Sequence, residues 1–386
     1  MDTRSPRWKR IVAIGLAAAA AVIAAAFTPA PATAAVPGLD FTVEDNTHPG
    51  AARIATDYGI TLGKGSGSIM LATCAIGTGQ IEVETIQNLE PLCFRVTGNG
   101  WLKMQITGAF GVGAGNGELS ATSTQSGQTT TIVVPANQRR GVGAVDGQST
   151  ILELEVNSYT GAARSAKPSD TPTGQHPYAA KITTGKGSCS GALISPRWVL
   201  TTASCFSATP AQYTSLTTGT PSTPSRAWFG LATSKPPANM GFSIAQVVPF
   251  KNAPGRDLAL VLLSKPATGI TPISLPTVTP TAGAAATFTG WGRNATEWLP
   301  PVGKTQALTV TAVEAGVLRT QAAASAMAFC DGDAGAPVVS GTTLLGIASQ
   351  SGEAGCVWSA STDRSGAASR VDDILPWIYS VIIANP

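Results

Sequence analysis

The chain has 386 residues, of which 43% are hydrophobic and 12% charged, and its formal net charge is +3. Its 42 glycines and 27 prolines make it rich in turns, which favours β-structure over helices, and its length is sufficient for two domains. No run of lysine or arginine follows the first ten residues. This excludes the basic surfaces typical of proteins that bind nucleic acid or anionic membranes.

Residues 1–34 are typical of a secretory signal peptide. Four basic residues within the first ten precede the 17-residue apolar run IVAIGLAAAAAVIAAAF, and the small residues Ala32, Thr33 and Ala34 follow it. We predict cleavage before Ala35 and a secreted, extracellular protein without a membrane partner. The alternative is a retained anchor, but 17 alanine-rich residues are short for a membrane span. Without the signal peptide the chain has 21 basic and 21 acidic residues.

Residues 35–163 contain short alternating runs, among them GQIEVETI, WLKMQITG and ILELEV, separated by clusters of Gly, Asn and Ser. An apolar period of two with frequent turns indicates an antiparallel β-sandwich or barrel, and we predict the sandwich. No catalytic cluster is present in this block.

The cysteines indicate disulfide bonds rather than a metal site. An even number in an exported chain is typical of disulfides in an oxidising compartment, and the spacing of Cys74 and Cys93 suits a bridge between neighbouring strands. A zinc site is disfavoured because the chain has no C-x-x-C motif and only two histidines, His48 and His176. We predict no metal and no cofactor. The six cysteines are Cys74, Cys93, Cys189, Cys205, Cys330 and Cys356.

Residues 164–177, rich in Pro, Ser and Thr without apolar periodicity, are predicted to link the two domains. Strand patterns resume in residues 178–386, for example RWVLTTAS, DLALVLL and ALTVTAV. Only the end of the chain has helical periodicity, with Val371, Ile374 and Ile378 on one face. The serine before Arg370 and the two aspartates that follow suit the start of this helix.

Four motifs in this second block, in the same order, resemble the chymotrypsin/trypsin family of serine proteases. They are CSGALISPRWVLTTASCF (189–206), RDLAL (256–260), TGWGR (289–293) and CDGDAGAP (330–337). The resemblance covers about residues 175–386 and implies two six-stranded β-barrels followed by a C-terminal helix. It also implies a bridge between Cys189 and Cys205. The alanine-, glycine- and threonine-rich composition resembles that of degenerate, secreted actinobacterial members of the family.

The resemblance implies a catalytic triad of which only one member is retained. Asp257 stands at the aspartate position, but Ser204 stands at the histidine position and Ala334 at the serine position. A serine is no general base at neutral pH, and an alanine has no atom with which to attack a carbonyl. We therefore predict a protease homologue without proteolytic activity, a pseudoprotease.

Other parts of the family's site are retained. The loop of Gly332, Asp333 and Ala334 still offers the backbone N–H groups of an oxyanion hole. Ala328 stands where trypsin-like members carry an aspartate, so selection of basic side chains is not expected. Ser349, Gln350 and Ser351 resemble the edge strand on which the family aligns its substrates. We predict that this strand pairs with an extended peptide.

Two carboxylates of this site need new partners. In activated members of the family, the aspartate at the position of Asp333 pairs with a new N-terminus. No such N-terminus is indicated in this sequence. We predict that an arginine or backbone donors hold Asp333, and that the Ser204 hydroxyl and a water hold Asp257, because an unpaired buried carboxylate is costly.

Three functions are compatible with these residues. The first is a pseudoprotease that binds a peptide or protein in its vestigial cleft. The second is an active endopeptidase that uses unrecognised groups. The third is a cell-wall or glycan adhesion protein with the barrels as a scaffold, although Trp101 is the only tryptophan in residues 35–163 that could form a sugar platform.

Overall fold

The computed structural model describes residues 36–75, 77–143, 149–161, 176–229, 241–251 and 256–385. The predicted signal peptide and residues 164–175 of the predicted linker lie outside this set. Among the described residues, no helix has both the length and the apolar character needed to cross a membrane.

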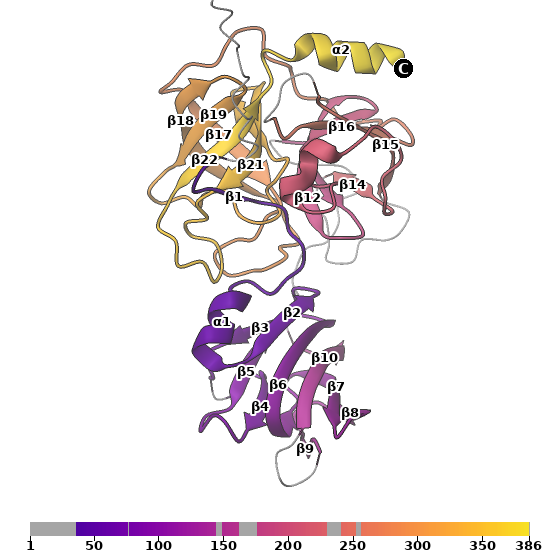
Figure 1. The fold of residues 1–386 in the computed structure, drawn as a ribbon, viewed down its shortest axis with the longest axis vertical. Coiled ribbons are helices and arrows are strands. Elements are labelled where there is room, and N and C mark those ends of the chain that lie inside the picture. The colour runs from indigo at the N-terminus through magenta and orange to yellow at the C-terminus, as the bar shows by residue number, and fades with distance from the viewer. Residues whose placement is uncertain are drawn as a thin grey trace, which may run out of the picture. The chain divides into compact units, whose positions relative to one another are not determined.

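The N-terminal domain is an antiparallel β-structure in which one strand is shared by two groups of strands (Figure 1). The first half of β6 pairs with β2 and β10, and its second half pairs with β4 and β9. Both groups bury their apolar side chains in one core, which includes Ile81, Leu119 and Leu154. The strands are β2 Thr61–Gly65, β3 Ile69–Ala72, β4 Ile81–Thr85, β5 Leu92–Val96, β6 Gly100–Gly113, β7 Gly117–Gln125, β8 Gln128–Val134, β9 Arg139–Gly141 and β10 Ser149–Tyr159.

Two helical elements were not predicted. A helix, α1 (Ala51–Tyr58), precedes the N-terminal sheet, and a 3-10 turn, η1 (Pro210–Ser215), lies within the second block. The helix α1 has eight residues, and Ile54 is its buried residue.

Two closed barrels follow, as the resemblance implies. The first has the strand order β11-β12-β13-β16-β15-β14. In the second, β21, β20, β17, β18, β19 and β22 are paired in sequence, and pairing of β21 with β22 closes the ring. Their bounds are β11 Ala179–Thr183, β12 Ser188–Ser195, β13 Trp198–Thr201, β14 Arg226–Phe229, β15 Phe242–Pro249, β16 Ala259–Leu263, β17 Ala285–Gly290, β18 Lys304–Glu314, β19 Val317–Ala322, β20 Pro337–Ser340, β21 Thr343–Ser351 and β22 Ser365–Arg370.

The C-terminal helix α2 (Leu375–Ala384) is confirmed, but its predicted start is wrong. Residues up to Arg370 belong to β22, and the helix begins only at Leu375 with Pro376 in its first turn. Proline is compatible with that position because the first turn does not use its N–H group.

The six cysteines form three disulfides, Cys74–Cys93, Cys189–Cys205 and Cys330–Cys356. The two predicted bridges are therefore confirmed. Short strand β1 (Asp40–Phe41) does not join the N-terminal sheet, because it pairs with β21 of the second barrel. Figure 1 shows this strand, drawn in indigo, beside β21.

Candidate functional site

Asp257 lies at the predicted triad position and is buried. One carboxylate oxygen accepts a hydrogen bond from the Ser204 backbone N–H (2.7 Å). The other accepts from the Ser204 hydroxyl and the Ser349 hydroxyl, both at 2.7 Å. The predicted Ser204 contact is thus present, and the Ser349 hydroxyl is a further donor that the sequence did not predict. Burial raises the pKa of Asp257, and these hydrogen bonds oppose the rise.

The loop around Ala334 forms the expected pair of backbone donors, and a carbonyl already occupies it. The N–H groups of Gly332 and Ala334 donate to the Thr42 carbonyl oxygen at 2.7 and 3.1 Å. Gly332 has φ +95°, and a Cβ there would lie 2.8 Å from the Cα of Gly292, so glycine is required for this loop geometry.

Asp333 is fully buried and anchors the same loop. Its carboxylate accepts hydrogen bonds from the backbone N–H groups of Gly292 and Cys330, both at 2.8 Å, and pairs with the Lys304 ammonium at 2.6 Å. The predicted backbone donors are confirmed, whereas the cation is a lysine and not an arginine. Burial lowers the pKa of Lys304, and Asp333 opposes that shift. The pair fixes the loop in the conformation that directs both donors at one carbonyl.

The occupant of the cleft is the chain's own segment around Thr42. Asp40 and Phe41 pair antiparallel with Ser351 and Gln350 of β21, and the Thr42 N–H donates to the Ser349 carbonyl at 3.0 Å. Beyond Thr42, Glu44 and Ser188 exchange two backbone hydrogen bonds of 3.1 and 2.9 Å. Residues 40–44 therefore lie as an extended strand across both barrels, with the Thr42 carbonyl at the oxyanion loop.

Of the predicted edge strand, Gln350 also contacts this segment through its side chain. The Gln350 amide accepts from the Val36 N–H (2.9 Å) and donates to the Leu39 carbonyl (3.2 Å). The Ser351 hydroxyl instead lies 3.5 Å from the Ser365 carbonyl. Ala328 is buried and, as predicted, brings no charge to the site.

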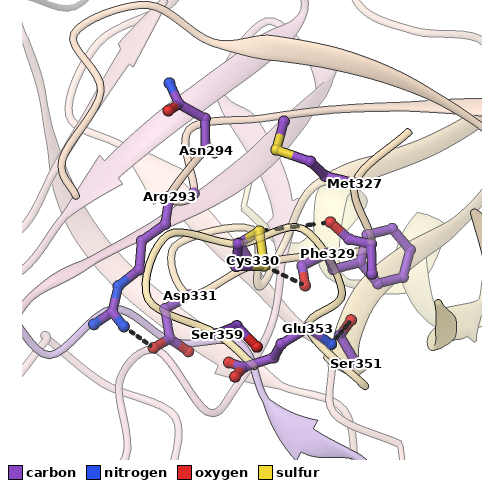
Figure 2. The surroundings of a disulfide bond; sticks show 12 residues. Arg293, Asn294, Met327, Phe329, Cys330, Asp331, Ser351, Glu353 and Ser359 are labelled. Atoms are coloured by element: carbon purple, nitrogen blue, oxygen red, sulfur yellow. Dashed lines mark hydrogen bonds and ion pairs between the residues drawn. A yellow bond between two sulfur atoms is a disulfide. The ribbon is translucent and has the colours of Figure 1, made fainter. Parts of the chain in front are cut away.

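A buried charge cluster binds Glu44, and part of it lies beside the Cys330–Cys356 disulfide. Arg293 donates to the Glu44 carboxylate through Nε (2.7 Å) and one terminal nitrogen (3.1 Å), and its other terminal nitrogen lies 2.9 Å from Asp331. Figure 2 shows Arg293 directed at Asp331, with Glu353 nearby. Burial raises the pKa of both Asp331 and Glu353, which share a hydrogen bond. Burial disfavours a charged Arg293, but Glu44 and Asp331 outweigh it, and the pKa of Arg293 is raised.

The described hydrogen bonds of the two histidines involve neither Asp257 nor Ser204. His48 Nε2 accepts a hydrogen bond from the Leu71 N–H (3.1 Å), and Nδ1 contacts the Pro49 carbonyl (2.7 Å). His176 Nδ1 contacts the Tyr178 hydroxyl at 2.7 Å. Sequence reasoning did not find Lys304, Arg293 or the segment at Thr42. Arg293 ends the TGWGR motif, but nothing in that motif indicates its partners Glu44 and Asp331. Lys304 and Thr42 belong to none of the four motifs.

Comparison with known proteins places the barrels in one family. The family model described as Trypsin matches residues 167–378. Snake venom serine protease homolog HS120 of Bothrops jararaca is 28% identical over 55% of this chain and 84% of its own length. Kallikrein 1-related peptidase b27 of Mus musculus is 27% identical over 54% and 86%, and trypsin alpha of Drosophila melanogaster is 28% identical over 51% and 78%. The fold, the site geometry and these matches agree, and the chain belongs to the trypsin family.

Proposed function

We propose that this trypsin-family protein is a pseudoprotease that binds an extended polypeptide in its cleft without cleaving it. The observation that carries the proposal is the Thr42 carbonyl, which accepts two hydrogen bonds in the oxyanion loop beside a residue, Ala334, whose side chain is a methyl group. A carbonyl held in this way is positioned for attack, and the group that would attack it is missing.

The chemistry of Ser204 supports the same conclusion. Its hydroxyl donates to Asp257, so the carboxylate that orients an imidazole in active enzymes is satisfied by a group that accepts no proton near neutral pH. Loss of nucleophile and base from such a triad costs about 10⁶ in rate. Binding of the peptide backbone does not depend on either side chain.

The proposal is tested with the purified natural protein and the Ser204→His/Ala334→Ser double variant. The readouts are turnover of a broad fluorogenic peptide library and cleavage of the protein's own chain, followed by mass spectrometry. We expect neither reaction from the natural protein and at least one of them from the double variant. Turnover by the natural protein would show that other groups catalyse the reaction and would refute the proposal.

We further propose that the protein acts outside the cell, as its N-terminal sequence predicts. Three disulfides join all six cysteines, and such bonds persist in oxidising compartments. Edman sequencing of the protein recovered from culture medium should begin at Ala35. Recovery of the intact N-terminus from the cell fraction alone would contradict this assignment.

A further inference from the structure

We propose that residues 41–44 define the class of peptide that the cleft selects, and that they act as a tethered competitor of any partner with such a segment. The class is an aromatic residue, then a small residue with a hydroxyl group, then an apolar residue (Val43 packs against the core of the first barrel), then a carboxylate. This inference rests on the proposed binding function, because it names the ligand of that same cleft. The chemistry of three positions supports it.

The first position takes an aromatic ring. Phe41 is partly buried against the core of the first barrel, and its ring meets Tyr213 of η1 edge to face, with centroids 5.9 Å apart. Such pairs stabilise contacts beyond the area they bury. An aliphatic or polar side chain at this position would lose the ring contact while keeping the backbone pairing with Gln350.

The second position takes a small side chain with a hydroxyl group. Thr42 has no exposed surface, and its Oγ1 donates to the Ser349 carbonyl at 3.0 Å. This partner is a neutral carbonyl, which offers no charge for a lysine or arginine. A buried basic side chain without a counter-charge is costly, so a basic residue is disfavoured here.

The fourth position takes a carboxylate. Glu44 is 1% exposed, and its oxygens accept from Arg293 and, at 3.3 Å, from the Trp298 indole N–H. The next residue, Asp45, is exposed and bonds only locally to Thr47. The cleft therefore distinguishes two adjacent acidic residues. Only the side chain of Glu44 reaches the buried guanidinium of Arg293, where a charged hydrogen bond is strong.

The tether determines how a partner reaches the cleft. A segment attached by a short connection acts at an effective concentration in the millimolar range, so it outcompetes a free peptide of equal intrinsic affinity until the free peptide reaches similar concentrations. Weakening the tethered copy, while leaving the cleft unchanged, should raise the apparent affinity for a free peptide by the same factor.

The experiment measures binding of a fluorescent peptide of residues 38–46 by anisotropy. Four full-length proteins are compared: the natural chain, Glu44→Gln, its matched control Asp45→Asn, and the triple variant Phe41→Ala/Thr42→Pro/Glu44→Ala. We expect Glu44→Gln to bind the peptide about tenfold more tightly than the natural chain, the triple variant about 100-fold more tightly, and Asp45→Asn with unchanged affinity. Equal affinities for the natural chain and Glu44→Gln would overturn the inference, whether or not the triple variant folds.

Variant peptides test the selectivity of the cleft. They are measured on the folded protein variant that binds the natural peptide most tightly. Glu44→Gln in the peptide should weaken binding about tenfold or more, Phe41→Ala should also weaken it, and Asp45→Asn should not change it. Binding of pooled random peptides separates the two proposals. If random peptides bind as well as this one, the selectivity is wrong and the binding function remains. If a folded variant binds no peptide, both proposals fail.

Discussion

The Asp333 carboxylate has no exposed surface, and the Lys304 ammonium, whose side chain is 9% exposed, balances its charge. Two charges removed from water stabilise a protein only as a pair, because either one alone has a large desolvation cost. The position of the oxyanion loop therefore depends on a single lysine that comes from the start of β18.

We predict that Lys304→Met lowers the free energy of unfolding by about 3 to 5 kcal/mol, because it leaves a buried carboxylate without its cation. Urea denaturation measures the change. The control is Arg319→Met, which removes an ion pair with Glu314 in which the two side chains are 31% and 47% exposed, and which should cost below about 1 kcal/mol. Similar losses in the two variants would mean that the lysine does not hold the loop.

The strand β1 has only two residues, and contacts with both barrels hold the segment that contains it. The backbone of residues 40–44 bonds to β21 on one side of Thr42 and to Ser188 at the start of β12 on the other. A segment held by both barrels in this way has its Thr42–Val43 peptide bond beside Ala334, whose N–H group donates to the Thr42 carbonyl.

We predict that the Ser204→His/Ala334→Ser variant cuts its own chain between Thr42 and Val43. The hydroxyl restored at position 334 would attack the carbonyl that Gly332 and Ala334 now hold, and water would then release the new carboxylate. N-terminal sequencing should give Val43 as the new first residue, and the single Ala334→Ser variant, without a base, serves as the control. A cut at another bond would show that the segment lies in a different register in solution.

On the scale of the whole molecule, one buried histidine links the stability of the fold to pH. His48 is 1% exposed, between the rings of Trp298 and Trp358 at centroid distances of 5.3 and 6.2 Å. Burial lowers the pKa of His48 from 6.5 to about 4. The unfolded chain therefore binds this proton more readily than the folded one does.

We predict that the His48 contribution to stability is complete above pH 6.5 and is lost as the pH falls toward 4, by about 3 kcal/mol in all. Denaturation midpoints measured across this range should fall for the natural protein. In His48→Gln the fall should be smaller, whereas the less buried control His176→Gln should keep it. A profile of the same slope in His48→Gln would assign the effect to other groups.

The barrels could be predicted from the sequence, and the triad positions could be assigned by resemblance. Each motif is a continuous run that includes an easily recognised residue, such as Cys205 beside Ser204. Period-two runs were also sufficient for the N-terminal sheet. The partner of β1 could not be predicted, since Asp40 pairs with Ser351, more than 300 residues away. The cation of Asp333 could not be predicted either, because Lys304 begins an ordinary alternating strand. Non-local pairing and charge balance are properties of the folded chain.

The Lys304–Asp333 pair also bears on when the oxyanion loop can form. In a family member whose equivalent aspartate pairs with a new N-terminus, the loop is completed only after a separate proteolytic cut. Here the ammonium group is part of the same uncut chain, so the loop can form as soon as the barrels fold. Formation of this loop therefore does not depend on a new N-terminus reaching Asp333.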